Sequence, residues 1–205
     1  MERQDGKTNE QQTVVPLPDC AIKSNGRVSE AFLQKGIGTF SEACRYIKSL
    51  PYGRNADKEA IFGVFDDNCG TCSTKHALLK KLAAENGVAL TLVTGIYKMH
   101  EGNTPGVGKI LSPYGLDYIP EAHNYFRIGA ETFDFTFAHN SQTGFNEELL
   151  EEVTVTPHEA VALKAQHHKN FLTRWLLANK NINLPLDTLW QIREACIAAL
   201  SQQQK

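Results

Sequence analysis

The chain lacks the features that mark several large classes of protein. No apolar run approaches the roughly 20 residues that a membrane-spanning helix needs, and no internal repeat is present. The net charge is only −2, so charge gives no reason to expect nucleic acid or a membrane as a partner. Residues 1–13 are polar and lack the apolar core of a secretory signal, so we expect a disordered tail there.

Cysteine is also scarce. The sequence holds five cysteines: Cys20, Cys44, Cys69, Cys72 and Cys196. An odd number, without a secretory signal and in a sizeable chain, argues against a disulfide framework. It indicates reduced thiols, and we therefore expect a cytoplasmic protein.

The length of 205 residues, with 41% hydrophobic and 21% charged residues, suits one globular domain. We place that domain at residues 14–205. Its core lies at about 40–138, and a helical C-terminal segment lies at about 156–203.

The most informative stretch runs from Cys69 to Gly87. It contains Cys69-Gly-Thr-Cys72, and the segment 73–86 has no proline or glycine and repeats leucine and alanine at helical spacing. Gly87 stands where a helix-ending glycine belongs. The pattern predicts a helix with Cys72 in its first turn. A thiol there meets unpaired N–H groups and the positive end of the helix dipole, and both favour the reactive thiolate.

The remaining patterns predict a mixture of helices and short strands. Thr39 and Glu42 have the spacing of a capping box, which predicts a helix that stops before Pro51. Further predicted elements are a second helix capped by Asn55 over 56–65, strands at 88–97, 123–128 and 132–137, and two C-terminal helices, the first capped by Thr156. We assign no chemistry to the C-terminal helices. The long loop 100–121 has the length of a binding loop or lid.

Two residues on the predicted hairpin suit the needs of a cysteine nucleophile. Such a thiol needs a base, and the base needs a group that orients it. A hairpin turning near Gly129 pairs His123 with Asp134 on one face, where the carboxylate can accept a hydrogen bond from the imidazole. Asp134 lies between two phenylalanines, a costly place for a charge unless a partner holds it.

These residues, in this order, resemble the transglutaminase-like superfamily, a group of papain-related cysteine enzymes. The resemblance covers about residues 40–138. Its blocks are the segment 43–52 ending at Tyr52, Gly70-Thr71-Cys72 with its helix, His123-Asn-Tyr-Phe, and Phe133-Asp134-Phe-Thr136. The chain departs from the family at His76, where a small residue is usual, and at Asn124-Tyr125, where Ala-Trp is common. The predicted strand pair is also shorter than usual.

The resemblance implies an α+β, transglutaminase-like (cysteine-proteinase-like) core, with the nucleophile helix on a small antiparallel sheet and extra C-terminal helices. It also implies a catalytic triad, with Cys72 as nucleophile, His123 as general base and acid, and Asp134 as the residue that orients the imidazole. The reaction would be acyl transfer on a protein, peptide or small amide through a thioacyl enzyme, with no cofactor. The backbone N–H of Cys72 is a natural oxyanion donor.

Two other functional classes stay open. One is a non-catalytic binding module that keeps this fold, with loop 100–121 and His76 shaping a pocket. The other uses Cys69-x-x-Cys72 as a redox pair or as half of a zinc site, with His76 and either His123 or His139 as further ligands. Taken alone, His76 is better interpreted as a polar residue near the mouth of the site.

Overall fold

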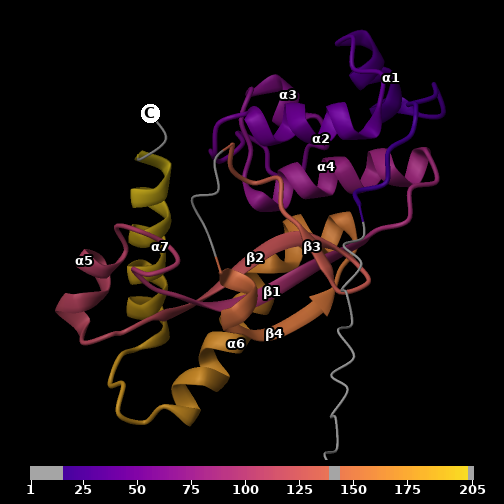
Figure 1. Ribbon diagram of the computed structural model, residues 1–205. Helices are drawn as coiled ribbons and strands as arrows, with labels where there is room; N and C mark the ends of the chain where they lie inside the picture. The colour runs from indigo at the N-terminus through magenta and orange to yellow at the C-terminus, as the bar shows by residue number, and fades with distance from the viewer. Residues whose placement is uncertain (1–15, 139–143, 203–205) are drawn as a thin grey trace, which may run out of the picture.

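The structure is a computed structural model that describes residues 16–138 and 144–202. Within these residues the chain forms an α+β fold of seven α-helices and one four-stranded antiparallel sheet (Figure 1). The helices are α1 (Arg27–Gln34), α2 (Phe40–Ser49), α3 (Gly63–Asp66), α4 (Cys72–Glu85), α5 (Gly108–Leu111), α6 (Lys164–Ala178) and α7 (Leu186–Gln202). The predicted tail, residues 1–13, lies outside the described residues. Within the described ranges, no helix is both long and apolar enough to cross a membrane.

The sheet has the strand order β3-β2-β1-β4. Its strands are β1 (Thr91–Met99), β2 (Ile119–Ile128), β3 (Glu131–Phe133) and β4 (Leu149–Thr154). Strand β3 pairs only with the last three residues of β2, whereas β1 pairs with β2 along its whole length. The middle of β2, including His123, therefore has a strand neighbour on one side only.

Helices cover both faces of the sheet (Figure 1). On one face, Leu92 and Phe126 pack with apolar side chains of α1, α2 and α4. On the other face, Val93 and Tyr125 pack with side chains of α5, α6 and α7. Adjacent strand residues point to opposite faces, so the alternation in β1 and β2 sends apolar groups into both layers.

Helices α2 and α4 form as predicted. Thr39 and Glu42 make the capping box of α2. Helix α4 begins at Cys72 and ends before Gly87, which has a φ of 68°. That left-handed conformation is costly for a residue with a Cβ, which explains why glycine ends the helix here.

Other predicted elements differ from the structure. The helix expected over 56–65 is reduced to the four residues of α3. Asn55 does not cap a helix, because its side-chain amide donates to the carbonyls of Gly63 and Cys69 and so ties a loop together. The strand expected at 132–137 ends at Phe133. Strand β4 was not predicted.

The hairpin turn lies where it was expected, but the predicted register is wrong. Ile128 pairs with Glu131 across the two-residue turn, so Asp134 falls opposite Tyr125 rather than His123. Residues 123 and 125 share one face of β2. Asp134 therefore approaches His123 diagonally, from the backbone that continues past the end of β3.

Candidate functional site

Cys72 is the first residue of α4, and the two residues before it fix its position. Thr71 caps the helix, and its side chain and that of Thr74 exchange hydrogen bonds with each other's backbone N–H groups. A Cβ on Gly70 would lie 2.9 Å from the Cγ of Lys75, so only glycine fits at this position. In the motif Gly70-Thr71-Cys72, glycine thus allows the close approach of the chain, threonine caps the helix and Cys72 is its first residue. The Cys72 side chain is buried, with 4% of the residue exposed.

His123 and Asp134 form the predicted hydrogen bond. The Nε2–H of His123 donates to Oδ2 of Asp134 over 2.9 Å. The other carboxylate oxygen accepts from the N–H and the hydroxyl of Thr136 at 2.9 and 2.6 Å. Burial raises the pKa of Asp134, but the neighbouring His123 outweighs this effect, and the pKa stays well below its usual range. The carboxylate is therefore ionised and fixed behind the imidazole.

The sulfur and the imidazole shift each other's pKa in opposite directions. Burial raises the pKa of the Cys72 thiol, but the charges and hydrogen bonds of Lys164 and His123 outweigh it and lower this pKa to about 5. Burial lowers the pKa of His123, but Asp134 and Cys72 outweigh it and raise this pKa to about 10. Between these limits the site holds a thiolate and an imidazolium side by side.

Lys164 is a fourth member of the site that the sequence did not predict. Its ammonium donates a hydrogen bond to the Cys72 sulfur over 3.0 Å. Lys164 opens α6 directly after a π-helical turn, Glu159–Leu163. A π turn rotates the preceding residues relative to regular α-helical spacing. A residue of the C-terminal helices, to which we assigned no chemistry, thus contacts the sulfur.

The π turn also explains why helical periodicity in the sequence did not predict Lys164 as a neighbour of Cys72. His168, Leu172 and Trp175 of α6 follow helical spacing and are buried. The residues before them depart from this pattern, because Val161 is only half-buried and Ala165 is exposed. The capping interaction predicted at Thr156 and Glu159 is present. No pattern in the sequence predicts the π turn that follows this cap.

His76 is buried beneath the site, not near its mouth as expected. None of its surface is exposed, and burial lowers its pKa to about 4. The neutral ring donates from Nδ1 to the carbonyl of Cys72 over 2.8 Å. Its Nε2 accepts from the N–H of Phe135 over 3.0 Å. His76 thus joins the first turn of α4 to the segment that carries Asp134.

These contacts bear on the zinc interpretation. Both ring nitrogens of His76 are engaged in protein hydrogen bonds, which leaves no lone pair for a metal ion. His139, another suggested ligand, lies outside the described residues. In the part of the chain that the structure describes, no three His, Cys, Asp or Glu side chains are grouped to hold a metal.

The two thiols of the Cys-x-x-Cys motif lie in different environments. Cys69 is half-buried beside Gly53, and burial raises its pKa, whereas the pKa of Cys72 is lowered. All five cysteines have free thiols. Only Cys72 therefore has the environment of an activated thiol.

Asn124 links helix α4 to the sheet. Its amide oxygen accepts from the hydroxyl of Ser73 over 3.0 Å, and its amide nitrogen donates to the hydroxyl of Thr94 over 2.8 Å. The residue is fully buried. Asn124 thereby holds the first turn of α4 against β1 and β2, next to Cys72 and His123.

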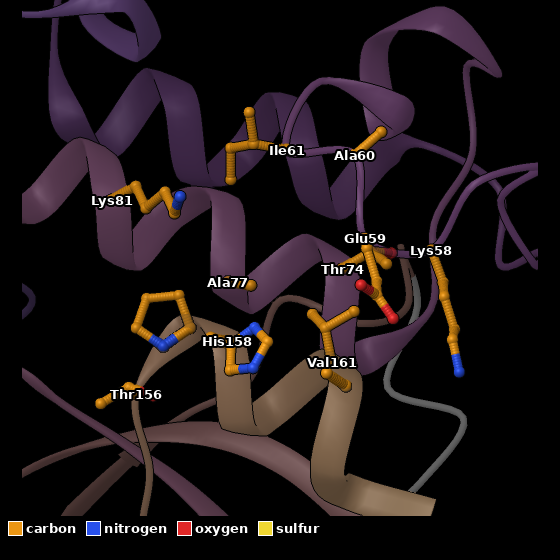
Figure 2. Close-up of a pocket in the computed structure, with 12 residues that line it drawn as sticks. Lys58, Glu59, Ala60, Ile61, Thr74, Ala77, Lys81, Thr156, His158 and Val161 are labelled. Carbon is orange, nitrogen blue, oxygen red and sulfur yellow. The ribbon is translucent and has the colours of Figure 1, made fainter.

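A groove of about 470 Å³ adjoins the first turn of α4. It is lined by residues on either side of Cys72, by the loop after Tyr52 and by the π turn: Thr71, Ser73 and Thr74; Arg54, Asn55, Ala56, Asp57, Lys58 and Glu59; and Val161. A hollow of about 260 Å³ shares four of these residues (Lys58, Glu59, Thr74 and Val161) and runs on along α4. Figure 2 shows this hollow, with Thr74, Ala77 and Lys81 on α4 opposite His158 and Val161.

The groove has the size of a ligand site, since small-molecule pockets measure roughly 300–1,000 Å³. Loop 100–121, expected to be a binding loop or lid, contributes no residue to the groove or the hollow. It contains α5, which packs against α7. The expectation that loop 100–121 lines a binding site is therefore not met in either of these cavities.

The assembled site has the chemical parts of a cysteine nucleophile: a thiolate, an imidazolium backed by a carboxylate, and a helix N-terminus. The N–H groups of the first helical turn have no partner within the helix. Such an arrangement favours attack on an electrophilic carbon and stabilises the charge that follows. Comparisons with family models, with curated proteins and with solved structures give no match for this chain.

Proposed function

We propose that this protein is a transglutaminase-like cysteine hydrolase or acyltransferase that acts on an amide or peptide-type substrate. The observation that carries the proposal is the alignment of the Cys72 thiolate, the His123 imidazolium and the Asp134 carboxylate. The three residues come in the order of the family, and the nucleophile opens a helix packed on an antiparallel sheet. Structural ion pairs also shift pKa values, so the proposal depends on this alignment and not on the shifts alone.

In the first half of the reaction, the Cys72 thiolate attacks the substrate carbonyl carbon. A carbon–sulfur bond forms, and the carbonyl π electrons move to the oxygen. Because Nε2 of His123 is engaged with Asp134, Nδ1 is the nitrogen that gives its proton to the leaving amine. The carbon–nitrogen bond then breaks and leaves a thioacyl enzyme and a neutral imidazole.

In the second half, neutral His123 takes a proton from water or an amine, which attacks the thioester. The carbon–sulfur bond breaks, and sulfur leaves as the thiolate. The Asp134 carboxylate stabilises the imidazolium that re-forms, so the resting ion pair is restored. The N–H of Cys72, free of intrahelical bonds, supports the oxyanion in both halves.

The groove beside Cys72 is the proposed binding site for the acyl donor. Its lining combines side chains of both charges, including Lys58 and Glu59, with apolar groups such as Val161. A polar peptide or a small amide suits this mixture and the volume of about 470 Å³. The small net charge of −2 fits such a substrate better than nucleic acid.

Iodoacetamide labelling across pH tests the proposal. With a pKa of about 5, Cys72 is mostly thiolate at pH 6, whereas a thiol with a pKa of about 8.5 is roughly 0.3% thiolate. Low-pKa thiolates are weaker nucleophiles, which offsets part of this gain and leaves a rate advantage of roughly tenfold. We expect the labelling rate of Cys72, followed by mass spectrometry, to rise with a midpoint near pH 5.

Cys69 is the control within the same chain, because its pKa is raised. We expect it to label only as the pH approaches the range of ordinary thiols or above. If Cys72 titrates like Cys69, or if His123→Ala leaves the midpoint of Cys72 unchanged, the activated pair does not exist and the proposal fails.

A non-catalytic binding module is the second candidate. The low exposure of Cys72, 4%, favours it, since the sulfur is not openly presented to solvent. In that case Cys72→Ala would leave ligand affinity and biological activity intact, whereas an acyl-transfer enzyme would lose activity.

A further inference from the structure

Lys164 contacts the reacting sulfur yet has no part in the reaction described above. Its ammonium lies 3.0 Å from the sulfur and is half-buried. The backbone that carries it is fixed upstream, because Thr156 and Glu159 exchange capping hydrogen bonds of 2.7 and 3.2 Å. Val161, in the π turn before Lys164, lines the groove. The lysine therefore stands where the groove, the π turn and the nucleophile meet.

Contact with the resting thiolate does not by itself give Lys164 a catalytic role. An ammonium that only stabilises the thiolate makes the ground state more stable and the sulfur less nucleophilic. A catalytic gain requires stronger interaction in the transition state than in the resting enzyme. The question is therefore where the negative charge goes when sulfur attacks.

During attack the charge leaves the sulfur and gathers on the carbonyl oxygen, two bonds away. Lysine has a flexible stem and three N–H donors, so an ammonium beside the sulfur can turn to that oxygen without moving its backbone. The N–H of Cys72 is the other donor at this end of α4. One backbone donor and one cationic donor would then surround the same oxyanion.

We propose that Lys164 is an oxyanion donor of the acyl-transfer reaction, acting together with the N–H of Cys72. The inference rests on the proposed function. In the resting enzyme Lys164 pairs with the thiolate, and in each tetrahedral intermediate it pairs with the oxyanion. When the intermediate collapses to the thioester, the electron pair returns to the carbonyl and the leaving group departs with the proton of His123. Lys164 neither gains nor loses a proton in this cycle.

Two reactions of Cys72 separate this role from simple stabilisation of the thiolate. Acetylation by 4-nitrophenyl acetate passes through an oxyanion, and alkylation by iodoacetamide does not. Both rates are measured at pH 9, where an ordinary thiol with a pKa of about 8.5 is largely ionised. The pH dependence of iodoacetamide labelling at Cys72, followed by mass spectrometry, gives the thiolate fraction of this residue in each variant, so that each rate is expressed per thiolate.

For Lys164→Met we expect acetylation per thiolate to slow by roughly 100-fold, the usual effect of losing one oxyanion donor. Hydrolysis of the acetyl enzyme slows as well, because it passes through a second oxyanion. Alkylation per thiolate is unchanged or faster. Lys180→Met, which removes an exposed lysine beyond the end of α6, is the charge-matched control and leaves both rates unchanged.

The possible outcomes distinguish a failure of the oxyanion role of Lys164 from a failure of the proposed acyl transfer. If both rates per thiolate fall by the same factor, or neither falls, Lys164 is not an oxyanion donor, while the acyl chemistry of Cys72 stands. If the wild-type chain is not acetylated at Cys72 at all, the proposed function fails and this inference fails with it. Should circular dichroism show that Lys164→Met does not fold, Lys164→Gln is tested for the same separation of rates.

Discussion

Asp134 lies between two imidazole rings, one on the side of α4 and one on the side of β2. On the α4 side, Nε2 of His76 is 3.6 Å from the carboxylate, and on the β2 side, Nε2 of His123 is 2.9 Å from it. Both rings are buried. Yet the pKa of His76 is lowered to about 4 and that of His123 is raised to about 10.

The partners of each ring account for the difference. Both nitrogens of His76 meet neutral backbone groups, and one of them accepts a hydrogen bond, which only the uncharged ring can do. His123 meets a carboxylate and a thiolate, and both favour its charged form. Burial alone would lower both pKa values. One carboxylate therefore lies beside a neutral histidine and a charged one.

Replacing each histidine gives the largest expected contrast. We expect His123→Gln to lower the turnover of 4-nitrophenyl acetate by roughly 1,000-fold, because the thioacyl enzyme loses the base that activates water. The measurement is steady-state release of nitrophenolate, with mass spectrometry to detect trapped acetyl-Cys72. An equal loss in a folded His76 variant would contradict the division of roles.

Replacing the shared carboxylate sharpens the comparison. In Asp134→Asn, His123 loses the largest influence that raises its pKa, and the pKa falls from about 10 toward the ordinary value of about 6.5. At pH 8.5 the protonated fraction of such an imidazole is roughly one hundredth. Nuclear magnetic resonance of the ring measures the midpoint directly. An unchanged midpoint for His123 would show that the carboxylate is not the cause.

The smallest expected effect is on stability, in His76→Ala. The variant leaves the Phe135 N–H without its acceptor and opens a void, so we expect the free energy of unfolding to fall by about 2 kcal/mol or more. Urea unfolding at neutral pH measures this loss. The pKa of Cys72 should change little.

The same variant tests the charge state of His76 through pH. The folded pKa of about 4 lies below the unfolded value of 6.5, so between these values the unfolded chain binds more protons. The stability that neutral His76 contributes is present above pH 6.5 and is lost as the pH falls toward 4. The stability difference between wild type and variant should shrink over that range. His168 has a similar shift in both chains, so it cancels in the difference.

Much of the site could be predicted because its signals are local. The helix at Cys72 and its closing Gly87 follow from spacing along one helix. The two-residue turn of the hairpin was also evident, although the register drawn from it was displaced by two residues. The contact between His123 and Asp134 survived that error, because residues two apart on a strand share a face.

The parts that sequence reasoning missed depend on distant partners. Lys164 contacts Cys72 from a position directly after a π turn, and helical periodicity in the sequence cannot predict such a turn. Residues 56–59 have a helical pattern, yet Asn55 uses its amide to hold a loop. His76 was predicted near the mouth of the site, and its burial could not be predicted because the backbone N–H that it binds belongs to Phe135, 59 positions along the chain.

The separation of Cys72 and Lys164 along the sequence has a consequence for how the site forms. The two residues are 92 positions apart, so their contact closes a long loop and forms only when the C-terminal segment has docked. Lys164 is the first among the groups that lower the pKa of Cys72, and His123 is the next. The full lowering of this pKa therefore depends on both ends of the described fold, and a chain without the docked segment keeps only the contribution of His123.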